Sequence, residues 1–142
     1  MTASEATYEL RDHTADVGVA ARGPSVDAVF GALADGLAAA MCDDVPESGE
    51  RFSFSIRSEN PEAALFDYLD QLIYERDVRG VLPVDNEATV RRDGEEWVVE
   101  ASARGVPFAD VAGAREVKAV TYSEMDLTET SDGWRAYVVF DV

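Results

Sequence analysis

The sequence contains one cysteine, one histidine and one lysine among its 142 residues, and these scarcities limit the kinds of site it can hold. Because Cys42 is alone, the chain has neither an internal disulfide nor a cysteine-based zinc site. The longest apolar runs are far shorter than the roughly 20 residues that a membrane span needs. The polar, acidic N-terminus does not resemble a secretory signal. We therefore expect a soluble cytoplasmic protein without a membrane association.

Basic residues are also few, since 12 lysines and arginines stand against 29 acidic residues and give a net charge of −17. The acids are spread along the whole chain. This favours a halophilic protein from a salt-rich cytoplasm, where a Debye length of about 3 Å at 1 M screens self-repulsion. The alternative is an acidic surface made for a basic partner. In either case the surface repels phosphate backbones, so we expect no tight direct nucleic-acid binding.

The chain does contain strand and helix signals over the length of one ordinary domain. Ser25 caps a predicted helix that ends near Cys42, and Asn60-Pro61 starts a second helix that ends at Arg79-Gly80. Residue patterns predict strands over 7–10, 17–21, 52–57, 84–91, 96–103, 117–122, 125–130 and 134–142, with a tight Asp-Gly hairpin turn at 92–95 and an irregular crossing over 105–113. Two helices amid seven or eight strands indicate a single α+β domain, residues 1–142, with the helices packed on a mostly antiparallel sheet.

The second predicted helix has one apolar and one polar face. Its expected buried stripe consists of Leu65, Phe66, Leu69, Leu72 and Ile73. The other face carries Asp67, Asp70, Gln71 and Tyr74, at spacings i, i+3, i+4 and i+7. A solvated helix face is the simplest interpretation of this set, and a docking surface is the alternative.

Residues 11–16 bring two carboxylates and the only histidine into one short segment, directly before the apolar alternation of Val17 and Val19. A polar segment at the point where a strand begins or bends usually lies at the rim of a sheet, where side chains can reach a ligand. The alternative is a capped turn, in which Asp12 and Thr14 accept hydrogen bonds from nearby amides and His13 merely packs.

Two further features lie towards the end of the chain. Lys118 is expected in the middle of a strand, on one face with Val120 and Tyr122, where a compact ammonium is needed; chance retention of one lysine is the alternative. The last strand keeps its alternation to Val142, which predicts a terminus that is held in place. The α-carboxylate then lies beside Asp141, and two such anions repel each other unless a cation accompanies them.

Three segments resemble the archease family: 12–17 (DHTADV), 116–122 (EVKAVTY) and 140–142 (FDV). The order of elements between them is similar as well. Archeases are small α+β proteins that assist the RtcB-type RNA ligase in tRNA splicing. The resemblance implies a protein cofactor rather than an enzyme, one that promotes transfer of a guanylyl group from GTP onto the ligase and supports multiple turnover.

The resemblance also implies a divalent cation held between the first motif and the end of the chain. Carried over by position, the ligands are Asp12, Asp141 and the terminal carboxylate of Val142, and such hard oxygen ligands suit Ca²⁺, Mg²⁺ or Mn²⁺. Asp16 and His13 are expected to support these ligands, because a fully extended segment would separate Asp12 and Asp16 by about 13 Å. Only a turn between them would bring both to one ion.

The lysine motif agrees with the family in one respect and departs from it in another. Lys118 matches the family's strand lysine and is expected to engage a phosphate or the ligase. Archeases often carry histidine on either side of this motif, where the present chain has residues such as Gly113 and Ser123. A histidine-rich metal site is therefore not inferred.

Two other functions stay open. The chain is a stand-alone metal-dependent phosphoester or nucleotide hydrolase if Asp12, Asp141 and the cation activate water with His13 as the base. The sequence has neither a phosphate-cradling Gly-rich loop nor a Gly-x-Ser-x-Gly elbow, which weighs against this hypothesis. It is a structural binding module if the 11–16 segment is only a turn.

Overall fold

The computed structural model describes residues 6–12 and 16–142, and for residues 11 and 12 it describes the backbone alone. In chain order the elements are β1 (Thr7–Asp12), β2 (Asp16–Gly23), α1 (Val26–Met41), β3 (Glu50–Ser58), α2 (Pro61–Arg79), β4 (Val81–Asp93), β5 (Glu96–Pro107), the short 3₁₀ helix η2 (Phe108–Asp110), β6 (Ala119–Thr130) and β7 (Gly133–Asp141). The predicted α+β class is confirmed, with two long helices and seven strands among the described residues.

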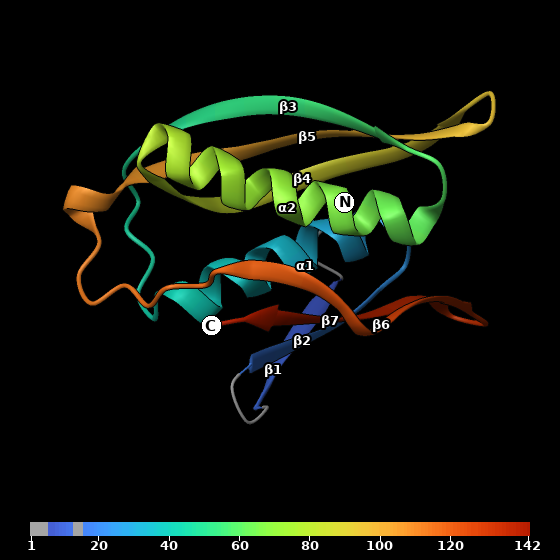
Figure 1. Cartoon of the computed structure of the whole chain (residues 1–142), viewed down its shortest axis with the longest axis horizontal. Helices are drawn as coiled ribbons and strands as arrows, with labels where there is room; N and C mark the ends of the chain where they lie inside the picture. Colours follow the sequence, from blue (N-terminus) through green and yellow to red (C-terminus); the bar gives the residue numbers. More distant parts are fainter. Residues whose placement is uncertain (1–5, 13–15) are drawn as a thin grey trace.

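The strands form two antiparallel sheets rather than one. Sheet A has four strands in the order β1-β2-β7-β6, and sheet B has three in the order β3-β5-β4. Figure 1 shows α1 and α2 as a layer between the two sheets, with β3, β5 and β4 above and β1, β2, β7 and β6 below. The inner faces of the two sheets therefore pack against the helices, and each helix contacts strands of both sheets.

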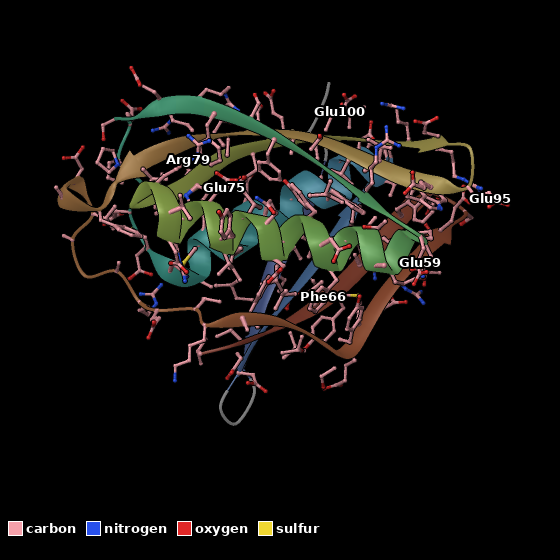
Figure 2. The ribbon with its side chains drawn as sticks, turned by 45° about the horizontal axis from the view of Figure 1, so that its top comes forward. Glu59, Phe66, Glu75, Arg79, Glu95 and Glu100 are labelled. Atoms are coloured by element: carbon pink, nitrogen blue, oxygen red, sulfur yellow. The ribbon has the colours of Figure 1, made fainter. Side chains whose placement is uncertain are left out.

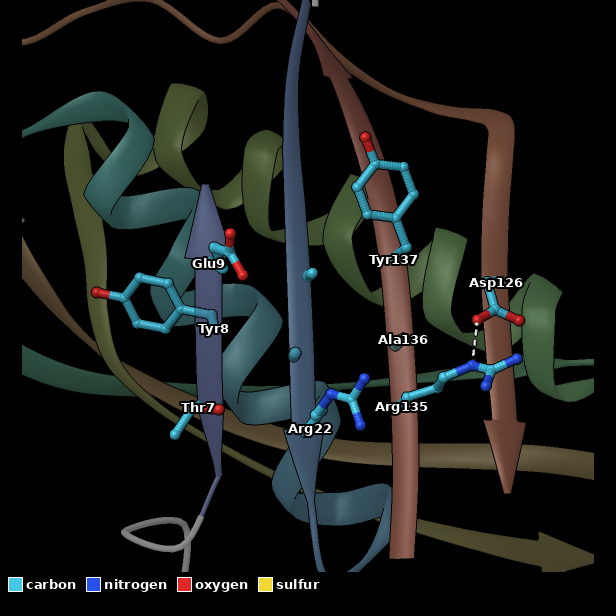
Figure 3. A pocket seen from close by; sticks show the side chains of 10 residues that line it. Thr7, Tyr8, Glu9, Arg22, Asp126, Arg135, Ala136 and Tyr137 are labelled. Carbon is cyan, nitrogen blue, oxygen red and sulfur yellow. Dashed lines mark hydrogen bonds and ion pairs between the residues drawn. The ribbon is translucent and has the colours of Figure 1, made fainter. Parts of the chain in front are cut away.

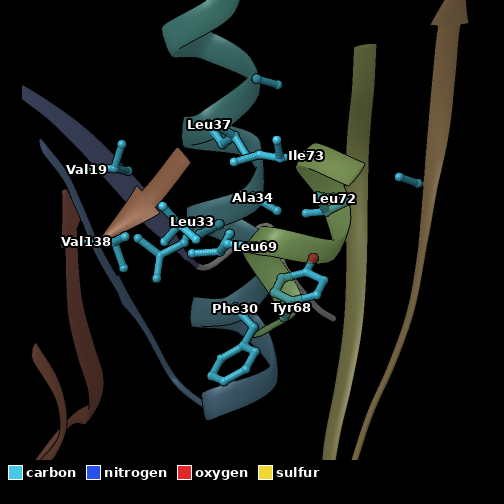
Figure 4. Close-up of a cluster of buried hydrophobic side chains, with 14 of the residues drawn as sticks. Val19, Phe30, Leu33, Ala34, Leu37, Tyr68, Leu69, Leu72, Ile73 and Val138 are labelled. Carbon is cyan, nitrogen blue, oxygen red and sulfur yellow. The ribbon is translucent and has the colours of Figure 1, made fainter. Parts of the chain in front are cut away.

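Helix α1 is enclosed because its side chains are small and apolar on nearly all sides. Ser25 caps it as predicted, with its side-chain oxygen accepting a hydrogen bond from the Ala28 amide at 3.1 Å. Phe30, Leu33 and Leu37 fill the space toward α2 and sheet A (Figure 4). Full burial of each such side chain contributes about 1.5–3 kcal/mol, so α1 is the centre of the core.

Helix α2 begins and ends at the predicted residues. The Asn60 side chain accepts from the Ala63 amide at 2.8 Å, and Pro61 occupies the first turn. Gly80 ends the helix in the left-handed conformation, at φ 65°, with its amide bonded to the Arg76 carbonyl. Its buried side chains meet those of α1, where Leu69 and Leu72 lie beside Leu33, Ala34 and Leu37 (Figure 4). Neither described helix combines the length and apolar character that crossing a membrane requires.

Strands β5 and β6 differ from the predicted pattern. The predicted irregular crossing at 105–113 begins later, because β5 continues to Pro107. Residues 117–122 and 125–130, predicted as two strands, belong largely to one strand, β6. Its pairing with β7 shifts between Thr121 and Asp126, where Tyr122 to Met125 bulge out of the ladder and Glu124 has a φ of 56°. The sequence pattern showed the break in alternation at this bulge but not that the chain resumes the same strand.

The bulge brings Tyr122 onto α2. Its ring stacks on Phe66 with centroids 4.2 Å apart and planes inclined by 6°. Phe66 was predicted as part of the buried stripe, but it is only half-buried. The Tyr122 ring covers one face of the Phe66 ring. This contact ties sheet A to the outer part of α2.

Candidate functional site

The residues predicted to hold a cation lie at one end of sheet A. Strand β1 ends there with Asp12, β2 begins there with Asp16, and β7 ends there with Asp141. The chain reverses direction between Asp12 and Asp16, because β1 and β2 are antiparallel. Asp12 pairs with Val17, the residue after Asp16, so the two aspartates lie on neighbouring strands, closer than the roughly 13 Å of a fully extended segment.

The strand register places Asp16 directly opposite Asp141. Cross-strand partners in an antiparallel pair have Cβ atoms about 4.5–5.5 Å apart and share one face of the sheet. Asp12 instead pairs with Val17, which pairs with Phe140, so its backbone position is one row further into the sheet. Sequence reasoning placed Asp16 in a supporting role, and the register places it directly across the strands from Asp141.

Both aspartates of this pair are partly buried. Among the side chains that the structure describes, neither carboxylate has a hydrogen-bond or ion-pair donor. Two like charges directly opposite on adjacent strands destabilise a sheet unless something compensates them. A cation placed between the two carboxylates would provide that compensation.

Lys118 lies at the same end of the sheet but not in mid-strand, so that prediction is wrong. Strand β6 begins one residue later, at Ala119, which pairs with Asp141. The backbone N–H of Lys118 donates to the Asp141 carbonyl at 2.7 Å, while the side chain is exposed. The alternation across Val117 to Tyr122 was present, but it did not show that the ladder starts only after the lysine.

Two arginines hold the segment that leads to Lys118. The guanidinium of Arg76, buried on α2, donates to the Val117 carbonyl at 2.6 Å. Arg115 donates to the carbonyls of Ala39 and Ala40 at the end of α1 and to Asp43. The hydrogen bond that Arg115 donates to Asp43, together with the positive charge of Arg115, lowers the pKa of the Asp43 carboxyl. Lys118 thus projects from a backbone that is fixed to both helices.

His13 lies outside the described residues, and so does the side chain of Asp12. Among the side chains that are described, no group of three or more His, Cys, Asp or Glu residues lies close enough to hold a metal ion. Val142 follows Asp141, the last residue of β7. A cation site at this position would therefore need Asp12, the chain end or both, in addition to the Asp16–Asp141 pair.

A second feature, not expected from the sequence, is a hollow of about 420 Å³ on the outer face of sheet A (Figure 3). Arg22 and Arg135 are cross-strand partners at its edge, and Tyr137 forms another wall. Asp126 accepts hydrogen bonds from Thr128 and, at 2.9 Å, from Arg135, and these two interactions lower its pKa. Only knowledge of which strands are neighbours would have brought these residues together.

The comparisons with known proteins agree with the sequence motifs. Residues 8–142 match the family model described as the Archease protein family. The chain is 32% identical over 149 residues to the protein archease of Methanosarcina barkeri, with 100% of each chain covered. It is also similar to the solution structure of Methanobacterium thermoautotrophicum protein 1598, with a TM-score of 0.83, 27% identity and coverage of 95% of this chain and 98% of that one. The crystal structure of an archease from Thermotoga maritima, described as a possible chaperone, matches with a TM-score of 0.62 and 25% identity over 94% of this chain and 96% of that one.

Proposed function

Because this chain belongs to the archease family, we propose that it is a non-catalytic protein cofactor that activates an RtcB-type RNA ligase in tRNA splicing. In this role it promotes guanylylation of the ligase and allows each ligase molecule to turn over repeatedly. The observation that carries the proposal is the family match over residues 8–142, which includes all three segments of the motif resemblance.

The surface charge supports action through a protein rather than through RNA. A net charge of −17 repels a phosphate backbone. The ligase itself must bind RNA, so its surface is expected to include basic regions that attract this chain. The activator would then work by docking on the ligase, without tight nucleic-acid binding of its own.

We further propose a divalent cation, Ca²⁺, Mg²⁺ or Mn²⁺, at the end of sheet A. Its ligands would be Asp12, Asp141 and the terminal carboxylate of Val142, with Asp16 and His13 in support. The cross-strand pairing of Asp16 with Asp141 fits this proposal, because two partly buried carboxylates without a cationic partner among the described side chains favour a bound cation. The donor atoms are all oxygen, as these ions prefer.

The residues at this end have distinct tasks in the proposal. A bound cation would neutralise the carboxylates and present positive charge to phosphate oxygens. The backbone carbonyl of Asp141 accepts a hydrogen bond from the backbone N–H of Lys118, so the lysine backbone is fixed to the end of β7. The exposed Lys118 ammonium can then meet a phosphate or a carboxylate of the ligase.

The test is the rate of ligase guanylylation by GTP at high salt, with and without this protein. We expect acceleration by the native chain, and none by Asp141→Ala or by a chain extended beyond Val142, both folded by circular dichroism. Asp132→Ala, in the turn between β6 and β7, is the matched control and should activate fully. No acceleration by the native chain would refute the function, whereas full activation by both altered chains would refute only the terminal site. Steady nucleotide hydrolysis by the chain alone would favour the hydrolase hypothesis.

A further inference from the structure

The outer side of α2 carries the most exposed apolar side chains in the described part of the protein. Val78 is 63% exposed, and Tyr74 and Tyr122 are each 56% exposed. Tyr74 and Val78 are one helical turn apart on α2, and Tyr122 reaches the same helix through its stack on Phe66. The α2 surface, as we call it, consists of the apolar residues Phe66, Tyr74, Val78 and Tyr122 and the carboxylates Asp67, Asp70 and Asp77.

The α2 surface is continuous along the helix. Phe66 and Val78 are twelve residues apart, which corresponds to about 18 Å along the helix axis. At 100° per residue, Asp67, Asp70, Tyr74, Asp77 and Val78 all fall within about one third of the helix circumference. Figure 2 shows Phe66 on the side of α2 that faces β6, with Glu59 and Glu95 near the start of the helix. Single exposed apolar residues are common, but an aligned set in one place marks an interaction site.

The bulge in β6 is the reason that Tyr122 belongs to this surface. Four residues, Tyr122 to Met125, stand opposite the single residue Val138, because Thr121 pairs with Val139 and Asp126 with Tyr137. Glu124 adopts a positive φ of 56° within this bulge. The chain thus leaves its ladder and places an aromatic ring on α2, where the ring stays half in solvent.

The charge of the α2 surface selects its partner. Its carboxylates are Asp67, Asp70 and Asp77, of which Asp67 accepts from Ser58 at 2.6 Å and Asp77 from Arg76 at 2.9 Å. The two arginines of this part of the helix leave most of this negative charge uncompensated, since among the described residues Arg76 pairs only with Asp77 and Arg79 pairs with Glu75, outside the α2 surface. Arg76 is buried against Val117, and Arg79 pairs with Glu75 and lies over the Phe52 ring. The exposed face therefore combines apolar side chains with a negative field.

This combination excludes most occupants. A second copy of the chain would bring a further net charge of −17 against the same face. Nucleic acid and anionic membranes are repelled for the same reason. A basic protein segment meets both requirements, because arginine or lysine side chains pair with the carboxylates and bind over the faces of Tyr74 and Tyr122. Apolar side chains of that segment would cover Val78.

We propose that the α2 surface docks the ligase through a segment in which arginine or lysine flanks apolar side chains. This inference rests on the proposed function and adds the surface through which the two proteins meet. The α2 surface lies near the end of sheet A, since its Tyr122 follows Lys118 by four residues, or about 13 Å of extended chain along the start of β6. One partner can therefore cover the α2 surface and reach the proposed cation site together.

The experiment is a binding titration of the purified ligase with the full chain at low and high salt. The triple variant Tyr74→Ser, Val78→Ser, Tyr122→Ser removes the exposed apolar groups without touching the end of sheet A, and we expect at least a tenfold increase in Kd. Val45→Ser, which removes an exposed apolar residue elsewhere, is the control and should bind normally. Circular dichroism and the melting temperature show that each variant is folded.

A second pair of variants tests the charge. Asp67→Asn, Asp70→Asn, Asp77→Asn should weaken binding at low salt by several-fold and less at high salt, where charges are screened. Asp44→Asn, Glu47→Gln, Asp132→Asn removes the same number of charges at other exposed positions and should have a smaller effect. A charge effect that is equal for both sets contradicts the proposed surface.

The outcomes separate the two proposals. If the native chain binds and activates the ligase and the triple variant does so equally well, the α2 surface is not the docking surface and the inference fails alone. If the native chain neither binds nor activates the ligase, both proposals fail. A dimer of the chain that the triple variant abolishes would also overturn the inference, because it would assign this surface to a second copy.

Discussion

Asp16 and Asp141 face each other across the β2–β7 pair at the end of sheet A. They are 125 positions apart in the sequence, and neither has a donor among the described side chains. Neighbouring carboxylates that remain ionised repel each other, and a shared cation removes the repulsion. The relationship therefore connects the strand order of sheet A with the proposed chemistry of the chain.

The first prediction concerns metal binding at this pair. Asp141→Asn should weaken the binding of Mn²⁺ or Ca²⁺ by at least tenfold, and Asp16→Asn should weaken it by a smaller factor, because Asp16 supports the ligands. Isothermal titration calorimetry measures both affinities. Asp70→Asn on α2 is the control for the loss of one charge. Unchanged affinity in Asp141→Asn would remove this residue from the ligand set.

The second prediction concerns the close approach of α1 to sheet A. A methyl group at Gly36 would overlap Cγ1 of Val19, which is fully buried and stiff at χ1. The helix preference of alanine over glycine is worth about 1 kcal/mol, whereas overpacking a core costs about 1–3 kcal/mol. Gly36→Ala should therefore lower the free energy of unfolding.

Urea denaturation of the single and double variants checks this explanation. Val19→Ala removes the overlapped group, so Gly36→Ala should be less destabilising, or even stabilising, in that background. A double-mutant cycle gives the coupling between the two sites. Additive effects would show that the overlap with Val19 is not the cause.

The third prediction concerns pH. Asp35 on α1 accepts hydrogen bonds from the backbone and side chain of Asn86, and its burial raises its pKa above the ordinary value of 3.8 in spite of these bonds. Because the folded state disfavours the ionised carboxylate, this group stabilises the fold when protonated. That contribution is lost as pH rises from 3.8 through the raised pKa.

Asp35→Asn should therefore gain stability relative to the native chain as pH rises from acidic to neutral. The new amide also supplies a donor near the Oδ1 atom of Asn86, which is buried without a partner in the described structure. Chemical denaturation at several pH values measures the difference, with Asp70→Asn as the control. A difference that is constant with pH would show that Asp35 does not titrate in this range.

The fourth prediction concerns salt. A net charge of −17 destabilises the folded chain through self-repulsion when salt is low. If the chain is adapted to a salt-rich cytoplasm, its melting temperature should rise steadily as KCl increases from about 0.1 to 1 M, over which the Debye length falls from about 10 to about 3 Å. A melting temperature that is independent of KCl would favour the alternative, an acidic surface that serves mainly to bind a basic partner.

The helix boundaries could be predicted because their signals are local. Ser25, Asn60 and Gly80 cap the helices at the expected positions, and the Asp93-Gly94 turn joins β4 to β5. Caps and tight turns depend on hydrogen bonds within a few residues, so the sequence is enough to place them. The division of the strands into two sheets could not be predicted, because alternation shows which face is buried but not which strand lies beside it.

The same limit applies to the candidate site. The carboxylates at the first motif and at the chain end could be selected from the residues and from the family resemblance. The strand register that places Asp16 opposite Asp141 could not be predicted, because it depends on β2 lying beside β7 in sheet A. Tyr122 was expected on a regular strand face, and its place on α2 depends on a bulge that no short pattern specifies.

The number of RNA molecules joined per ligase molecule tests the central claim most directly. With ligase limiting, GTP in excess and salt high, the native chain should allow many joining events for each ligase, and Asp141→Ala should reduce this to about one. Joined RNA that stays at one per ligase with the native chain present, or that is equally abundant with Asp141→Ala, would contradict the account.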